Sequence, residues 1–217
     1  LFGHGDVRVQ VLGNSGRKPT PEEKQKMFDI ACEHMQAGAF GVSSGLEYVP
    51  GRFADVDDLV TVSKPVAEAD GIHSMHMRNE GPALFEAVQE ALEVTEKSGV
   101  RFEISHLKAV GEDNWGKLPK VLEMLDEANA RGIDISADVY PYLASSTELA
   151  IVLPDWVLEN GKAAAVELLV EGSPVRERIV AESHARTEKQ GGWDKIVVIS
   201  VENPEDKWMA GLNVQEI

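Results

Sequence analysis

The chain has 217 residues, of which 43% are hydrophobic and 27% are charged, as is usual for a globular domain. Its 37 acidic and 21 basic residues give a net charge of -16, so we expect neither nucleic acid nor an anionic membrane surface as a partner. The sequence contains no apolar run of about eighteen residues that would predict a membrane span, and its single cysteine fits a reducing compartment. We therefore expect a cytoplasmic protein.

The first clearly predicted helix begins at Thr20 and ends at Gly38. Thr20 is a favourable N-cap residue, Pro21 occupies the first helical position, and Glu23 completes a capping box. Gly38 is typical of a helix C-terminus. Cys32 lies inside this helix among apolar residues, and we interpret it as a packed structural thiol rather than a reactive one.

Short apolar segments then alternate with helices that carry a periodic apolar face. The predicted strands begin near residues 39, 72, 100 and 133, and the predicted helices cover 55–69, 82–98 and 115–130. A spacing of roughly thirty residues is that of a βα unit. This alternation predicts a parallel sheet.

A doubly wound sheet and a (β/α)8 barrel both fit this alternation. A dinucleotide-binding sheet should carry a G-x-G-x-x-G turn after a strand, and the sequence has none. A barrel instead carries its chemistry at the carboxyl ends of successive strands. The polar residues at the predicted strand ends are Ser43 and Ser44, His76 and Arg78, His106 and Lys108, and Asp138 and Tyr140. We therefore predict an α/β fold that is a partial (β/α)8 TIM barrel, because a whole barrel needs about 250 residues.

The pattern changes near residue 146. Residues 153–193 read as helical segments, and the run KIVVISV at 195–201 predicts a return to β structure. We divide the chain into central βα units of the barrel at 1–145, a helical insertion at 146–194 and a return to the barrel at 195–217. An insertion over the barrel mouth and a separate small subdomain both fit the middle part.

Two histidines in one predicted strand, His73 and His76, must point to opposite faces because strand side chains alternate. His76 lies at the strand end and shares its face with Arg78, whereas we expect His73 to pack beneath a helix. His106 and Lys108 project together from the end of the next strand. Neutral imidazole is a favoured zinc ligand, although a single strand-end histidine is more often an ordinary polar residue. A catalytic zinc usually has three protein ligands, and the sequence offers two.

Seven segments resemble one known family. They are GHGDVR, RKPTPEE, AGAFGVSSGLEYVPGRFA, HMRNE, ISHLKAVG with NWG, DVYPYLASST and LPDW, in this order between Gly3 and Ile217. They resemble the N-acyl-D-amino acid deacylases (D-aminoacylases) of the metal-dependent amidohydrolase superfamily. The resemblance implies a zinc-dependent (β/α)8 barrel with a helical insertion after a late strand. It also implies a small-molecule substrate, an N-acyl-D-amino acid whose amide bond is hydrolysed.

The resemblance also implies roles for individual residues. It assigns His76 and His106 as metal ligands on the fifth and sixth barrel strands, and Tyr140 as a catalytic donor to the polarised acyl oxygen. The candidate substrate-binding residues are Lys108, Tyr140, Ser146 and Arg78.

Other family features have no counterpart in this sequence: the H-x-H of the first strand, the bridging ligand of the second, the aspartate base of the eighth and the arginine beyond it. We therefore expect the middle part of a deacylase, with little or no activity by itself. We also expect self-association through the open edges of an incomplete barrel.

Two alternatives remain at this point. A cyclic amidase of the dihydroorotase or hydantoinase type shares the barrel and both histidines, but it usually carries a carboxylated lysine on the fourth strand, and AFGVSSG contains no lysine. The other alternative is a noncatalytic metal-binding or scaffolding remnant of a barrel.

Overall fold

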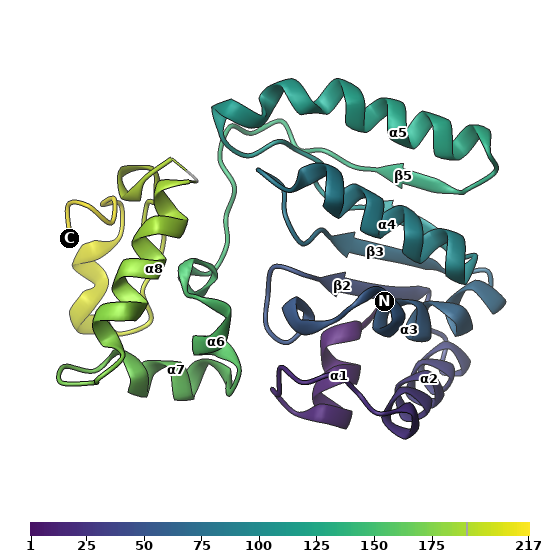
Figure 1. Cartoon of the computed structure of the whole chain (residues 1–217), viewed down its shortest axis with the longest axis horizontal. Coiled ribbons are helices and arrows are strands. Elements are labelled where there is room, and N and C mark those ends of the chain that lie inside the picture. The colour runs from purple at the N-terminus through teal and green to yellow at the C-terminus, as the bar shows by residue number, and fades with distance from the viewer. Residues whose placement is uncertain (190) are drawn as a thin grey trace.

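A computed structural model of the protein describes residues 1–189 and 191–217 (Figure 1). Its N-terminal part contains a five-stranded sheet in which all neighbouring strands are parallel, in the order β1-β2-β3-β4-β5. The strands are β1 (Phe2–Gly3), β2 (Gly41–Gly45), β3 (Ile72–His76), β4 (Arg101–Ile104) and β5 (Ile135–Ala137).

Five helices accompany these strands. They are α1 (His4–Leu12), α2 (Pro21–Gln36), α3 (Val56–Glu68), α4 (Leu84–Ser98) and α5 (Leu118–Ala130), with short 3-10 turns at Gly51–Phe53 and Glu112–Lys117. Because strands that follow one another along the chain are also neighbours in the sheet, right-handed connections place the helices on one face. A doubly wound sheet would reverse its strand order and cover both faces. The fold is therefore that of part of a (β/α)8 barrel, as predicted.

The predicted capping box of α2 is confirmed. The Thr20 hydroxyl accepts a hydrogen bond from the backbone N–H of Glu23 at 3.3 Å, and the Glu23 carboxylate accepts one from the backbone N–H of Thr20 at 2.8 Å. β1 and α1 were not predicted from the sequence. β1 has only two residues, and the valines at every second position of α1 (VRVQV) imitate the alternation of a strand.

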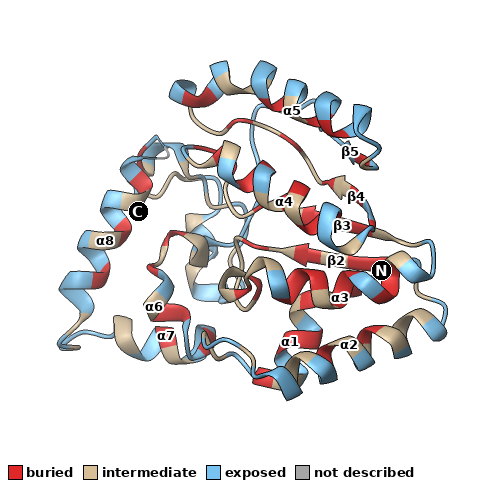
Figure 2. Cartoon of the chain, turned by 45° about the vertical axis from the view of Figure 1, so that its right-hand side comes forward, coloured by how far each residue is buried: buried red, intermediate tan, exposed pale blue. Residues whose placement is uncertain are grey.

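The core lies between the sheet and its helices (Figure 2). Val42, Met75 and Phe102, from three adjacent strands, are at most 1% exposed. The alternate side chains, which face away from the helices, are polar: the hydroxyls of Ser74 and Ser105 lie 2.8 Å apart. His76 lies on this second face, since it is two residues from Ser74 along β3. The sheet thus presents a polar surface on the side that would be the interior of a closed barrel.

A separate helical unit follows the sheet. It contains the 3-10 turn Leu149–Val152 and the helices α6 (Asp155–Leu158), α7 (Gly161–Leu169) and α8 (Arg176–Glu188), as predicted for this stretch. A small core of its own is formed by Val157, Leu158, Ala165 and Ile179. In the part of the chain that the structure describes, no helix has the length and apolar character needed to cross a membrane.

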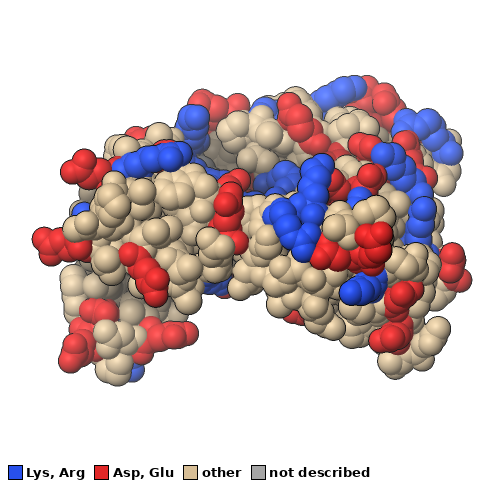
Figure 3. Space-filling model, turned by 60° about the horizontal axis from the view of Figure 1, so that its bottom comes forward, with Lys and Arg blue, Asp and Glu red and all other residues tan. Residues whose placement is uncertain are grey.

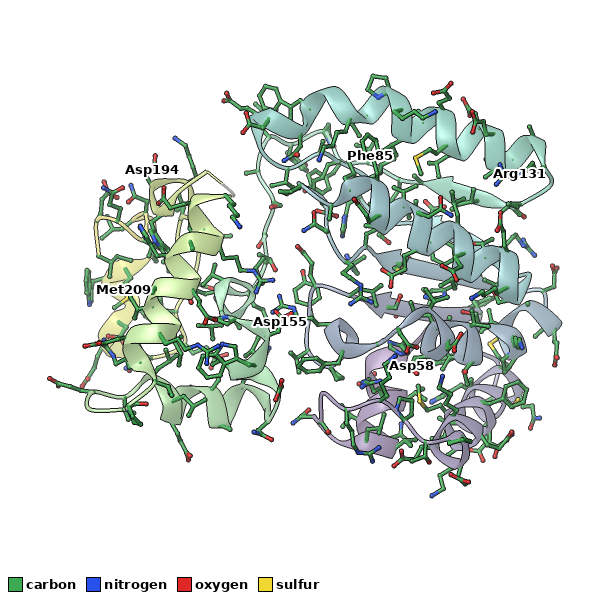
Figure 4. The ribbon with its side chains drawn as sticks, viewed as in Figure 1. Asp58, Phe85, Arg131, Asp155, Asp194 and Met209 are labelled. Carbon is green, nitrogen blue, oxygen red and sulfur yellow. The ribbon has the colours of Figure 1, made fainter. Side chains whose placement is uncertain are left out.

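One carboxylate connects the helical unit to the sheet. Asp155 lies on the side of the unit that faces the strands (Figure 4), where it accepts from the guanidinium groups of Arg52 and Arg186, both at 3.1 Å. On the face drawn in Figure 3, one group of basic side chains lies in the middle of the molecule, and further basic and acidic side chains are spread over both ends. The junction between the two parts is therefore electrostatic in character, with Val49 as an apolar contact to the small core.

The predicted return to β structure at 195–201 is limited to one β-bridge, and the segment does not form a strand. An isolated antiparallel bridge joins Val197 to Asn213, and backbone hydrogen bonds pair 196–198 with 211–214 beside α8 (Figure 1). The β-branched residues of 195–201 favour a strand only where they pair with a neighbouring strand, and in the described sheet this segment pairs with neither edge strand, β1 or β5. The division into 1–145, 146–194 and 195–217 stays a prediction, as does self-association through the sheet edges.

Candidate metal centre

Two histidine rings face each other at the carboxyl end of the sheet. His76 is the last residue of β3, and His106 follows β4 by two residues. The ring centroids lie 4.4 Å apart at an angle of 40°, and Nδ1 of His76 points at Nε2 of His106. Two half-buried imidazoles that direct a nitrogen at one point are suited to share a cation.

The backbone at His106 adopts an unusual conformation. Its φ is 45°, in the left-handed region that few non-glycine residues occupy, and its N–H donates to the side chain of Asp138 after β5. Strand alternation predicted that the side chains of His106 and Lys108 project from the same face of one strand. The two residues do lie together, but β4 ends at Ile104, so the turn and not the strand pleat orients the His106 ring.

A carboxylate that the sequence analysis overlooked, Glu80, lies between His106 and Lys108. Its Oε2 is 2.5 Å from Nζ of Lys108, and Nζ also lies 2.9 Å from Nδ1 of His106. The Oε1 atom is 2.8 Å from the same Nδ1, although the N–H direction there is poor for a hydrogen bond. Glu80 is only 8% exposed. Its position in HMRNE, four residues after His76, is the signal that could have identified it.

Tyr140 completes this group. Its ring centroid lies 6.2 Å from that of His106, and Nζ of Lys108 lies 5.3 Å from the ring centre. The hydroxyl of Tyr140 is buried and has no hydrogen-bond partner within residues 1–189 and 191–217. The structure thus brings together four predicted site residues: His76, His106, Lys108 and Tyr140.

The other two predicted residues lie apart from this group. The Arg78 guanidinium pairs with Glu90 at 2.8 Å and donates to the carbonyl oxygens of Arg52 and Ala54, both at 2.6 Å. These partners hold Arg78 to the loop after β2, which gives the side chain a structural role. Ser146 is exposed. Substrate contact by Arg78 and by Ser146 stays a prediction.

Burial shifts two titratable groups at this end of the sheet. Desolvation, and then the neighbouring His106, lower the pKa of His76, which favours the neutral ring that a metal requires. Desolvation, and then the charge of Glu80, raise the pKa of Glu47, which follows β2. Both shifts have burial at the carboxyl end of the sheet as their first cause.

His73 is a structural residue, as predicted. It is fully buried, and its Nδ1 and Nε2 lie 2.8 Å from the hydroxyls of Ser63 on α3 and Ser44 on β2. The Ser63 hydroxyl donates to the carbonyl oxygen of Leu59, so it accepts from Nδ1–H, and Nε2 accepts from Ser44. Burial, and then His4, lower the pKa of His73 to about 3.

The remaining histidines and the cysteine are not part of the site. Burial, and then Arg8, lower the pKa of His4 to about 4. His34 stacks on the ring of Phe2 at 5.0 Å. Burial raises the pKa of the Cys32 thiol, which fits the predicted structural role.

Zinc fits this site only in part. The facing nitrogens of His76 and His106 are suitable as two ligands. Across residues 1–189 and 191–217, however, no three His, Cys, Asp or Glu side chains are grouped so that they could hold a metal ion. The described residues therefore offer two of the three protein ligands of a typical catalytic zinc site.

Three curated bacterial proteins are similar to this chain, whereas no family model matches it. The N-acyl-D-glutamate deacylase of Alcaligenes xylosoxydans xylosoxydans is 36% identical over 155 residues, which are 71% of this chain and 31% of that protein. The D-aminoacylase of the same organism is 36% identical over 149 residues, 69% of this chain and 31% of that protein. The matches thus span less than a third of these relatives.

Solved structures of deacylases and D-aminoacylases are also similar to this chain. The N-acyl-D-glutamate deacylase from Bordetella bronchiseptica, in complex with zinc and a phosphonate inhibitor, matches 99% of this chain and 37% of its own length, with a TM-score of 0.75 and 27% identity. A D-aminoacylase structure matches 65% of this chain and 30% of its own length, with a TM-score of 0.62 and 32% identity. The partial barrel and the helical unit together therefore have a counterpart in a zinc-containing relative.

Proposed function

The chain is a homologue of the N-acyl-D-amino acid deacylases and D-aminoacylases, and from this premise we propose that it forms part of the catalytic centre of a hydrolase that cleaves the amide bond of N-acyl-D-amino acids. The observation that carries the proposal is the facing pair His76 and His106, with Lys108 and Tyr140 beside it. All four lie at the carboxyl end of the strands, where (β/α)8 enzymes hold their active sites.

His76 and His106 would hold a zinc ion through the two nitrogens that face each other. When bound, zinc supplies a water of lowered pKa and polarises the acyl carbonyl. The presence of zinc in the homologous Bordetella enzyme supports this choice of metal. Burial lowers the pKa of His76, which favours the neutral ring that coordination requires.

Two further side chains would bind the substrate. The buried hydroxyl of Tyr140 would donate a hydrogen bond to the acyl oxygen as negative charge develops there, and such a donor is typically worth about 3 kcal/mol of barrier. The Lys108 ammonium, which lies over the Tyr140 ring and is paired with Glu80, would also bind the substrate carboxylate. Ser146 and Arg78 remain the other proposed contacts.

The general base and the remaining metal ligands are not assigned to residues of this chain. We therefore expect the purified 217-residue chain to hydrolyse little or no N-acetyl-D-glutamate. Hydrolysis at a measurable rate, abolished by His106→Ala, would show that the chain supplies its own base.

Zinc binding tests the proposed site directly. The purified chain is mixed with zinc and a chromophoric chelator, and the competition gives the affinity. His76→Ala and His106→Ala should each weaken zinc binding at least tenfold, because each removes one of the two ligands. His184→Ala is the matched control, since that ring lies on α8 and stacks on Trp193. Equal zinc affinity in all three variants and the starting chain would refute the assignment.

A further inference from the structure

We infer that Glu80 is a positioning residue that selects the metal-binding tautomer of His106, an inference that rests on the proposed function. Glu80 belongs to the loop between β3 and α4, and its carboxylate reaches the loop after β4. It does not face the nitrogen that would bind the metal. Its influence is on the opposite nitrogen of the same ring.

The backbone fixes Glu80 in this place. Its carbonyl oxygen accepts a hydrogen bond from the N–H of Val110 at 2.7 Å, which fastens the loop after β3 to the loop after β4. The side chain is 8% exposed, so the carboxylate cannot be solvated by turning outward without opening both loops. A buried carboxylate is retained only where cations or donors compensate it, and here Lys108 and His106 are those partners.

Two groups compete for Nδ1 of His106. Oε1 of Glu80 lies 2.8 Å from this atom and Nζ of Lys108 lies 2.9 Å from it. A lysine ammonium has only donors, so a hydrogen bond from it requires a lone pair on Nδ1 and leaves the ring proton on Nε2. A carboxylate only accepts, so it requires Nδ1–H and leaves the lone pair on Nε2. Only the second tautomer directs a lone pair at His76.

Glu80 favours the second tautomer in two ways. Its Oε1 lies 2.8 Å from Nδ1, where it would accept from Nδ1–H, and its Oε2, 2.5 Å from Nζ, engages the ammonium of Lys108. The carbonyl oxygen of His106 accepts from the same ammonium at 2.8 Å, so Lys108 is satisfied without Nδ1. Carboxylates behind metal-bound histidines fix ring orientation and tautomer in this manner, and their loss usually costs 10- to 100-fold in metal affinity.

The other side of His106 is held independently. Its backbone N–H donates to the Asp138 side chain, and its φ of 45° is set by the turn. A change at Glu80 therefore leaves the backbone of His106 in place and alters the ring proton. A variant of Glu80 therefore reports on the ring proton of His106 and not on its backbone conformation.

The experiment uses Glu80→Gln, which keeps the shape of the side chain and removes its charge. Nitrogen-15 NMR of the histidine rings in the metal-free chain reports the tautomer. We expect Nδ1–H at His106 in the starting chain and a shift toward Nε2–H in Glu80→Gln. Zinc affinity, measured by chelator competition, should fall 10- to 100-fold. Glu103→Gln is the control, because the Glu103 carboxylate on β4 bonds the hydroxyl of Ser136 on the next strand.

A second variant removes the competitor. Adding Lys108→Met to Glu80→Gln should restore Nδ1–H, because the glutamine oxygen can still accept and no ammonium remains. The inference is overturned if His106 carries Nε2–H in the unmodified chain, a measurement that needs no variant to fold. It is also overturned if Glu80→Gln changes neither the tautomer nor the zinc affinity. If the starting chain binds no zinc while the tautomer still follows Glu80, the proposed metal site fails and the role of Glu80 stands.

Discussion

The buried imidazole of His73 should make the stability of the protein depend on pH. Its pKa is about 3 in the folded chain, because the ring is desolvated between α3 and the sheet, against about 6.5 for a histidine in the unfolded chain. Since the folded value is the lower one, the stabilising contribution is complete above pH 6.5. It is lost as the pH falls from there toward 3.

The size of the effect follows from this difference. Below pH 6.5 the unfolded chain binds one more proton at this residue than the folded chain, which costs about 1.4 kcal/mol per pH unit. Between pH 7 and pH 5 the loss is about 2 kcal/mol for His73. His4, with a folded pKa of about 4, adds about 2 kcal/mol over the same interval.

Urea unfolding of the metal-free chain at pH 7 and pH 5, followed by circular dichroism, measures the free energy of unfolding at each pH. His73→Gln should lower stability at pH 7 but reduce the loss between the two pH values by about 2 kcal/mol. Phe102→Leu is the control, because it disturbs the ring that packs 4.8 Å from His73 without removing a titratable group. If His73→Gln and Phe102→Leu lose equal stability between pH 7 and pH 5, the titration of His73 does not cause the loss.

Three further substitutions can be tested in the same titration at pH 7. Asp58→Ala should cost about 3–5 kcal/mol, because it leaves Arg8 buried without the carboxylate that lies 2.7 Å away; a loss below about 1 kcal/mol would contradict this. Thr20→Ala should cost about 1 kcal/mol through loss of the α2 N-cap, with unchanged stability as the opposing result. Gly41→Ala should cost at least about 2 kcal/mol, because an added Cβ meets the carbonyl oxygen of Ile72; a neutral effect would mean that β2 moves to make room.

Much of the fold was predictable because its signals are local. The alternation of strands and helices, the capping box at Thr20 and the opposite faces of His73 and His76 each depend on residues close together in the chain. The pairing of His76 with His106 also followed, because parallel strands of neighbouring βα units end at the same edge of the sheet.

Other features depend on contacts between distant loops. The sequence by itself determined the alternation of helices and strands between residues 20 and 137 and the two candidate ligands, whereas the tertiary structure decided which groups surround them. Arg78 was predicted to share a strand face with His76, but β3 ends at His76 and Arg78 is held by Glu90 and two carbonyl oxygens. Glu80 reaches across to His106 and Lys108. The hydrophobic periodicity of the sequence does not encode these side-chain contacts, because they depend on where the loops after β3 and β4 meet. The two loops meet only when the register of the sheet brings the ends of β3 and β4 together.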